Sequence, residues 1–533
     1  MDQLTLLFIV LFATIIVVPL ARRIGLPFPV LLTVLGIVLA VLNFVPNVEI
    51  EPELILPVVL PPLLYASAQR SSWRQFAANR RPILLLAVAL VVVTTVVVAY
   101  VGSALVPGLT LASAFVLGAM IAPPDPVAAS AVAGSLGLPR RMVSILEGEG
   151  LFNDVTAIVI YGVAVDAVVT GKFSAWHAAL QLVLSAVLAI AIGYAIGWVA
   201  NRLLTVMNDS TLQIGLTLIV PTFSYVIAEE LHGSAVLAVL VTSLYLTGRA
   251  YGPDDSETRL QASAFWEVVE LLVTGGAFTL IGLELHNVVR GVSHTWTSLL
   301  WPALAVAGVV IAVRLLWLLP MTWFSHRLAA RHRRKPGEER GEQPTGWRET
   351  VVMWWAGMRG VATIALALGV PLTVDGGKDF PGRPQILFVA FVVVLVTLVL
   401  QGLSLPGLVK ALRVRDAGED EERQEKLLAK RAAKASLRRL KEIEGVEDLP
   451  DEVVERLRRR HADLLARLSP DAYDEEQKAA LKERTKRLVR MREIESEMSS
   501  AARAAVLSAR SEPGMDPEVV DRVLRRLDLR AMH

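Results

Sequence analysis

The sequence predicts an all-α polytopic membrane protein, with a membrane part at residues 1–410 and a charged tail at residues 411–533. Hydrophobic residues make up 54% of the chain and the mean hydropathy is +0.52, which is higher than soluble globular domains usually show. The net charge is only +2, but the charged residues are concentrated in the tail. Two regions that face different solvents follow from this division.

The membrane part contains thirteen apolar runs, each close to the roughly 20 residues that a helix needs to cross a bilayer. The first run has no basic stretch before it and no cleavage site after it, so we expect it to be retained as a span. The thirteen runs begin near Leu4, Pro27, Leu54, Pro82, Gly108, Met142, Trp176, Thr211, Ser234, Ala262, Thr297, Trp347 and Pro384.

Alternate loops between these runs are rich in arginine, for example at Arg80, Arg81, Arg140 and Arg141, whereas the opposite loops carry few basic residues. Basic loops face the cytoplasm in membrane proteins. The pattern therefore predicts a multi-pass protein of a plasma membrane, such as a bacterial inner membrane, with its N-terminus outside and its C-terminus in the cytoplasm. This orientation requires an odd number of spans, which thirteen satisfies and eleven would also satisfy.

Two of the runs are interrupted by residues that oppose a continuous helix. The fifth contains Pro123, Pro124, Asp125 and Pro126, and the twelfth contains the segment 357–360, which reads Gly-Met-Arg-Gly. Broken helices in corresponding positions of two inverted repeats indicate the substrate site of a transporter. We expect Asp125 to lie at the positive N-terminal end of a half-helix, and Arg359 to offset exposed carbonyl groups. The alternative for the prolines is an ordinary loop between two helices.

The segment 146–158, LEGEGLFNDVTAI, places acidic residues inside an apolar run, where they are rare and usually functional. On a helix, Glu149 and Asn153 share a face, as do Gly150 and Asp154. Carboxylate and amide oxygens suit hard cations. A buried carboxylate can be neutralised by a metal ion or by a proton, but not by both at once, and this competition is the basis of antiport.

Several functions are excluded by what the sequence lacks. The chain has no cysteine, so disulfides, thiolate metal sites and a cysteine nucleophile are ruled out. No phosphate-binding glycine loop, zinc spacing or nucleophile triad is present. We therefore expect a transporter rather than an enzyme, with no cofactor besides the transported ions and no nucleic-acid partner.

These motifs resemble those of the monovalent cation/proton antiporters, the family of animal sodium/proton exchangers and bacterial NhaP-type proteins. The resemblance covers about the first 410 residues and is carried by several ordered motifs. They are EGEGLFNDVTAIVIYG at 147–162, LPPLLYASAQ at 60–69, Asp125-Pro126, FTLIGLEL at 278–285, AVRLLW at 312–317 and GMRGVATIALAL at 357–368.

The resemblance implies a cation- and proton-binding site built around Asp154, which would bind Na⁺ and H⁺ alternately. It implies that Asn153 supports this carboxylate, that Asp125 lies where the broken helices cross, and that Pro124 offers a backbone carbonyl to the ion. Family members are homodimers. Two hydroxyl groups that are common in the family are missing here, because Gly150 and Pro124 take the places of a serine and a threonine.

The resemblance also implies an ion pair between Glu149 and Arg314 that holds helices together, and it matches Arg359 to the charged residue at the second break. Asp125 would be the closer partner of Arg359, which leaves Asp154 without an arginine. Other acidic residues are expected to be solvated at extracellular helix ends, among them Glu284, Glu229 and Glu230.

The predicted function is secondary antiport of a monovalent cation, Na⁺ with Li⁺ or K⁺ as alternatives, for H⁺ by alternating access. One exchangeable carboxylate predicts one cation per proton, and thus electroneutral transport that serves pH and sodium homeostasis. A cation channel and a membrane-embedded sensor that signals through the tail are the competing functions.

The tail is expected to form amphipathic helices, with apolar residues at near-helical spacing and an N-terminal helix signal at 516–518. The apolar residues are Leu427, Leu428, Leu437, Leu440 and Ile443.

Overall fold

The computed structural model describes eleven longer stretches and a few other residues of the tail. The stretches are 3–41, 52–70, 80–125, 138–172, 175–207, 209–248, 256–292, 296–331, 346–414, 419–444 and 497–508, and the other residues lie between 452 and 527. The chain divides into two compact units, Met1–Asp416 and Ala417–His533, which are described separately. The expected boundary between a membrane part at 1–410 and a cytoplasmic tail at 411–533 stays a prediction.

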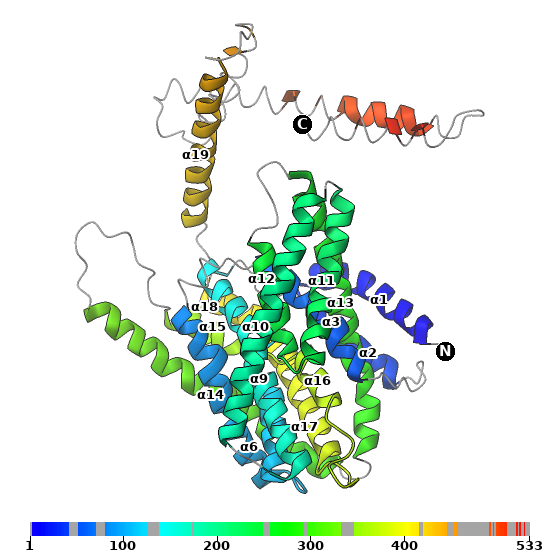
Figure 1. Ribbon diagram of the computed structural model, residues 1–533, viewed down its shortest axis with the longest axis vertical. Coiled ribbons are helices and arrows are strands. Elements are labelled where there is room, and N and C mark those ends of the chain that lie inside the picture. Colours follow the sequence, from blue (N-terminus) through cyan, green and yellow to red (C-terminus); the bar gives the residue numbers. More distant parts are fainter. Residues whose placement is uncertain are drawn as a thin grey trace. The chain divides into compact units, whose positions relative to one another are not determined.

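The described residues of the first unit are mostly helical (Figure 1), and they contain a single isolated β-bridge between Thr373 and Asp379 and no strand. Two of its elements are short π-helical turns within longer helices, η1 and η3. The elements are α1 (Gln3–Ile24), α2 (Phe28–Val41), α3 (Pro52–Arg70), α5 (Arg80–Leu84), η1 (Leu85–Leu90), α6 (Val91–Leu105), α7 (Leu111–Ile121), α9 (Arg140–Thr170), α10 (Ala175–Val206), α11 (Ser210–Glu230), α12 (Ala235–Thr247), α13 (Ser256–Gly291), α14 (Trp296–Arg331), α15 (Trp347–Trp355), α16 (Val361–Leu368), α17 (Arg383–Val396), η3 (Thr397–Gln401) and α18 (Gly402–Leu412).

Within the described residues, seven helical stretches are long and apolar enough to cross a bilayer, and four shorter helices are apolar as well. A helix is present at each of the thirteen positions where a span is expected. The all-helical polytopic architecture is thus confirmed. The count of thirteen crossings and the inverted repeats stay predictions.

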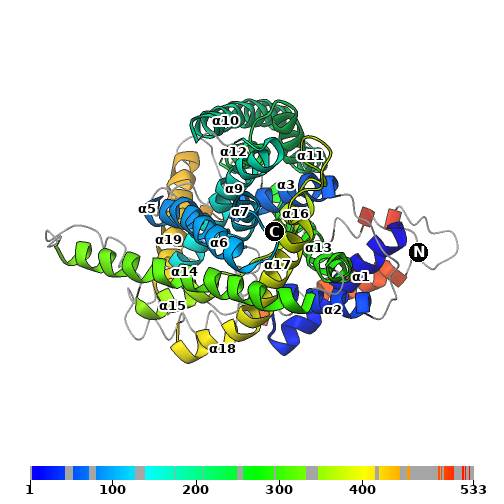
Figure 2. The ribbon, with the colours of Figure 1, turned by 90° about the horizontal axis from the view of Figure 1, so that it is seen from below.

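Figure 2 shows α7, α16 and α17 at the centre of the first unit, with α10, α11 and α12 on one side and α14, α15 and α18 on the other. The central helices are buried over most of their length, including every residue of α7 from Val116 to Ile121. The outer helices instead expose large apolar side chains, such as Val187 and Trp198 of α10. An apolar exterior around a buried core is the arrangement expected for a protein surrounded by lipid.

The helix is interrupted at both expected places. Helix α7 ends at Ile121, and the backbone is irregular as far as Asp125, where Pro123 and Pro124 donate no backbone hydrogen bonds. Pro126 lies outside the described residues. Helices α15 and α16 are separated by the non-helical residues 356–360. The two interruptions lie side by side, because α7 contacts α16 across more than 200 residues of sequence.

The second unit contains α19 (Glu419–Glu444), the longest helix that is described there. Leu440 is buried, whereas Leu427 and Leu428 are exposed. The helix signal at 516–518 lies outside the described residues. The cytoplasmic helical domain therefore stays a prediction.

Candidate functional site

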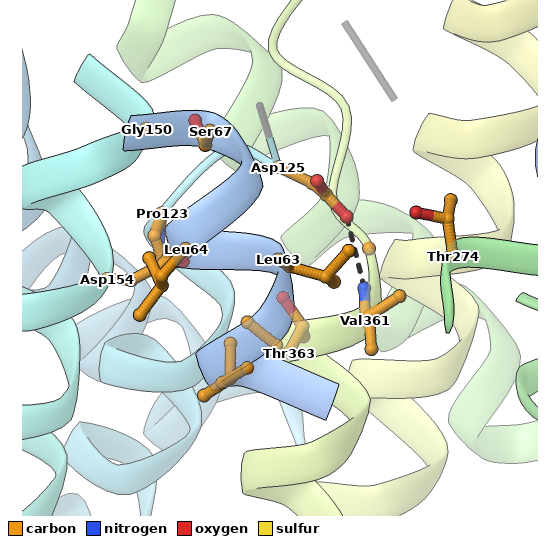
Figure 3. A pocket seen from close by; sticks show the side chains of 13 residues that line it. Leu63, Leu64, Ser67, Pro123, Asp125, Gly150, Asp154, Thr274, Val361 and Thr363 are labelled. Carbon is orange, nitrogen blue, oxygen red and sulfur yellow. Dashed lines mark hydrogen bonds between the residues drawn. The ribbon is translucent and has the colours of Figure 1, made fainter. Parts of the chain in front are cut away.

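The two helix interruptions border a small cavity of about 40 Å³, which we call the ion cavity. Segments from α3, the end of α7, α9, α13 and the start of α16 line it, and Figure 3 shows their side chains. Both Asp125 and Asp154 belong to the lining. The cavity is large enough for one or a few water-sized occupants.

Asp125 connects the two interruptions directly. Its backbone N–H donates to the Met358 carbonyl oxygen at 2.7 Å, and its Oδ2 accepts a hydrogen bond from the Val361 N–H at 3.1 Å (Figure 3). Val361 is the first residue of α16, so the carboxylate lies at the positive end of this half-helix. The position agrees with the one expected from the sequence.

Gly360 makes this close approach possible, because a Cβ atom at that position would fall on the Asp125 carboxylate. It would lie 2.5 Å from Cγ and 2.9 Å from Cβ of Asp125, closer than side-chain atoms approach one another in folded proteins. A glycine is therefore required for the present contact between the interruptions.

Arg359 stabilises the carbonyl end of α7. Its Nε donates to the Ile121 carbonyl at 2.9 Å, one terminal nitrogen donates to the Ala122 carbonyl at 3.0 Å, and the other donates to the Gly357 carbonyl. Its backbone N–H donates to Thr397 Oγ1 in η3 at 3.1 Å. The described hydrogen bonds of the Arg359 guanidinium go to three carbonyl oxygens, two at the end of α7 and one in the second interruption, where it offsets their negative partial charge. The expected pairing with Asp125 is not among these bonds.

Asn153 links α9 to the first interruption. It is fully buried, and its Nδ2 donates to the Pro124 carbonyl oxygen at 2.8 Å. Its Oδ1 has no hydrogen-bond partner within the described part of the chain. The Pro124 carbonyl, which was expected to face the ion, thus already accepts one hydrogen bond, and Pro123 rather than Pro124 lines the cavity.

Asp154 is one turn away from Gly150, and both residues line the ion cavity. Its side chain is 7% exposed, and it forms no hydrogen bond or ion pair with any residue that the structure describes. The two buried arginines nearby make their contacts elsewhere. A carboxylate placed in this way is available for an ion or a proton.

Three hydroxyl side chains line the same cavity and were missed in the sequence: Ser67 of α3, Thr274 of α13 and Thr363 of α16. The Thr274 Oγ1 atom is buried without a hydrogen-bond partner among the described residues. In the sequence, each of these residues is visible only as a small polar residue inside an apolar run. That pattern alone does not predict which cavity the side chain faces.

Glu149 and Arg314 form a buried ion pair outside the ion cavity. The two terminal nitrogens of Arg314 donate to the two carboxylate oxygens at 2.5 and 2.9 Å, and its Nε donates to the Met353 carbonyl at 3.2 Å. The pair joins α9, α14 and α15. Gly357 leaves room for the guanidinium, since a Cβ there would lie 2.7 Å from Arg314 Nε.

The donor set around the cavity suits a monovalent cation. Among the described residues, no three His, Cys, Asp or Glu side chains gather as a polyvalent metal site would require. Two carboxylate residues and three hydroxyl residues line the cavity, and their oxygens are hard donors of low total charge.

The prediction that Glu284 is solvated at a helix end is wrong. Glu284 is instead 7% exposed and lines a second cavity of about 210 Å³. Glu229 and Glu230 are exposed, as expected. Glu284 is buried because α3 and α16 cover this part of α13, and a single span considered alone cannot reveal that contact.

The fold and the two crossing interruptions define a polytopic helical membrane transporter. The family model for "Sodium/hydrogen exchanger, transmembrane" matches residues 7–411, and the chain belongs to this family. It is 33% identical to an uncharacterized Na(+)/H(+) exchanger of Mycobacterium tuberculosis, over 94% of this chain and 90% of that protein. It is 32% identical to the Na(+)/H(+) antiporter ApNhaP of Aphanothece halophytica, over 76% and 74% of the two chains. The fold resembles that of the sodium proton antiporter MjNhaP1 of Methanocaldococcus jannaschii, with a TM-score of 0.60 and 17% identity over 77% of this chain and 98% of that one.

Proposed function

We propose that this protein exchanges a monovalent cation, principally Na⁺, for H⁺ by alternating access, with Asp154 as the residue that binds the two ions in turn. The observation that carries the proposal is the position of Asp154, which lines the ion cavity beside the crossing interruptions and has no described cationic partner. Burial disfavours a bare carboxylate charge, so this side chain binds either a proton or a cation.

The other groups of the cavity supply the remaining ligands in this mechanism. Asp125, the hydroxyls of Ser67, Thr274 and Thr363, and bound water provide oxygen atoms around the ion. A volume of about 40 Å³ leaves no room for a full hydration shell, so the cation has to shed most of its water. Li⁺ and K⁺ are the competing cations.

The expected stoichiometry is one cation per proton. Asp125 is already engaged by the Val361 N–H at the N-terminus of α16, and we assign it no proton in the cycle. Asn153 carries no charge. Asp154 is then the single group in the cavity that changes protonation, and transport is electroneutral.

Asp154→Asn tests the proposal in proteoliposomes that contain purified protein, with a pH-sensitive dye inside and a sodium gradient applied. We expect exchange to be abolished at normal expression. Asp166→Asn is the matched control, because Asp166 is exposed on the same helix, α9. Exchange that persists in Asp154→Asn would remove the assigned role. Conductive flux in the wild-type protein would indicate a channel, and absence of flux would indicate a sensor.

We further propose a homodimer in the plasma membrane that serves pH and sodium homeostasis, with the N-terminus outside and the tail in the cytoplasm. The chain contains no cysteine, so a single cysteine introduced at either end reports its side of the membrane without background. An impermeant maleimide added to intact cells should label the N-terminal cysteine only. Labelling of the C-terminal cysteine would reverse the orientation.

A further inference from the structure

A second cavity of about 210 Å³ lies between α3, α13 and α16. Its walls are apolar except for one side chain, the buried carboxylate of Glu284. The hydrogen bond described for this carboxylate comes from Asn287 Nδ2 to Glu284 Oε2, at 3.1 Å. At least one carboxylate oxygen therefore remains available to a donor from a ligand, since a carboxylate has room for about four hydrogen bonds.

The volume and lining of this cavity define what fits. An apolar protein cavity of about 150 Å³ is sufficient for benzene, so 210 Å³ accommodates an aromatic ring with a short alkyl chain. Val59, Ala277 and Ile364 are among the side chains that would surround the ring. A hydrated metal ion is a poor occupant, because nine of the ten lining residues are apolar.

The single carboxylate determines which polar group a ligand of this cavity needs. An ammonium group placed at Glu284 forms a charge-assisted hydrogen bond, which is stronger than a bond between neutral groups. We infer that the second cavity is a binding site for a small aralkylammonium ion, with its ring among the apolar side chains of α3, α13 and α16 and its ammonium group on the Glu284 carboxylate.

The second cavity is connected to the ion cavity through two shared elements. Val361 lines both cavities, and its N–H is the donor to Asp125. Along α13, Thr274, Ala277, Ile281 and Glu284 follow one face, with Thr274 in the ion cavity and Glu284 in the second cavity. Ten residues of helix place these two about 15 Å apart along the axis, so an amine on Glu284 is separate from an ion on Asp154.

Occupation of the second cavity restrains α16 against α3 and α13. If the proposed exchange function holds, a bound amine therefore inhibits transport, because the start of α16 forms part of the ion site. The binding itself does not depend on the exchange function.

The test is equilibrium binding of radiolabelled 2-phenylethylamine to the purified full-length protein in detergent, with 2-phenylethanol as the neutral analogue. We expect saturable amine binding to the wild-type protein. We expect binding to be about tenfold or more weaker in Glu284→Gln, because the charge is lost. Competition by 2-phenylethanol should be equal in the two proteins, which also shows that the variant retains the folded cavity. Ala277→Met should abolish binding of both compounds, because it fills the cavity.

Two further variants separate this inference from the exchange function. Glu230→Gln removes an exposed carboxylate at the end of α11 and should bind the amine as the wild type does. Asp154→Asn should also retain amine binding, whether or not it retains exchange. The inference is overturned if the wild type binds no amine, if Glu284→Gln binds it as tightly as the wild type, or if Asp154→Asn loses binding while Glu284→Gln keeps it.

Discussion

Gly360→Ala is the most direct perturbation of the contact between the two interrupted helices. A methyl group at this position would overlap the Asp125 carboxylate, and the nearest atoms on both sides are attached to rigid, buried backbone. Asp125 must therefore move away from the start of α16. The variant then loses the 3.1 Å hydrogen bond from Val361 to Asp125.

The cost follows from two contributions. Inserting a methyl group into a well-packed interior costs about 1 to 3 kcal/mol. Losing a hydrogen bond to a charged group costs about 1.5 to 3 kcal/mol. We expect Gly360→Ala to lower the free energy of unfolding by roughly 2.5 to 6 kcal/mol. We also expect it to lower the exchange rate of the remaining folded protein by at least about tenfold, since Asp125 lines the ion cavity.

The assay is unfolding in mixed micelles followed by tryptophan fluorescence, together with exchange in proteoliposomes. Gly308→Ala is the matched control, because a Cβ at Gly308 in α14 meets no atom within 4 Å. Alanine is favoured over glycine within a helix by about 0.5 to 1 kcal/mol, so this control should be as stable as the wild type or slightly more stable. If Gly360→Ala behaved like Gly308→Ala in both assays, the contact between the interruptions would not have the proposed importance.

Three other predictions concern separate parts of the site. Thr274→Val should raise the apparent KM for Na⁺ several-fold, because it removes one of the proposed oxygen ligands. It should not lower stability, because the buried hydroxyl has no hydrogen-bond partner among the described residues. An unchanged KM would show that the Thr274 hydroxyl does not bind the ion. Glu149→Gln should destabilise the protein by about 3 to 5 kcal/mol in mixed-micelle unfolding, because the buried Arg314 loses the negative charge of its partner. The double variant Glu149→Gln/Arg314→Met should recover part of that loss. Protons compete with Na⁺ at Asp154, so the apparent KM for Na⁺ should rise about tenfold for each unit by which the pH falls, in the acidic range where the site is mostly protonated. An apparent KM that does not change with pH would contradict a single shared carboxylate.

The helices and the two interruptions could be predicted because their signals are local. Apolar run length defines a crossing, and proline or paired glycine within a run opposes a continuous helix. The same signals predicted that Asp125 would lie at the N-terminus of a half-helix, but they did not identify that half-helix as α16, which is far away in the sequence. The Glu149 and Arg314 pairing came from resemblance, because nothing in either residue's neighbours identifies a partner 165 positions away.

What could not be predicted depends on contacts between distant segments. Thr274 and Ser67 contribute hydroxyls to the ion cavity only because α13 and α3 pack across it, and the burial of Glu284 depends on the same packing. The acceptor at Thr397 lies in a π-helical turn, η3, which shifts its side chain relative to a regular α-helix. The interruption itself predicted that Arg359 would offset exposed carbonyl groups, but which carbonyls it reaches depends on the contact between α7 and the second interruption.

The hydrogen bonds around the interruptions imply which parts of the molecule move together. Asp125 is bonded to Met358 and Val361, Arg359 is bonded to the last carbonyls of α7, and Asn153 is bonded to Pro124. These bonds join α7, α9, α15 and α16 into one cluster that carries both Asp125 and Asp154. The hydroxyls of Ser67 and Thr274 belong to α3 and α13, and neither hydroxyl is among the groups that these bonds join. In the alternating-access cycle proposed above, we expect the cluster that carries both carboxylates to move as one unit.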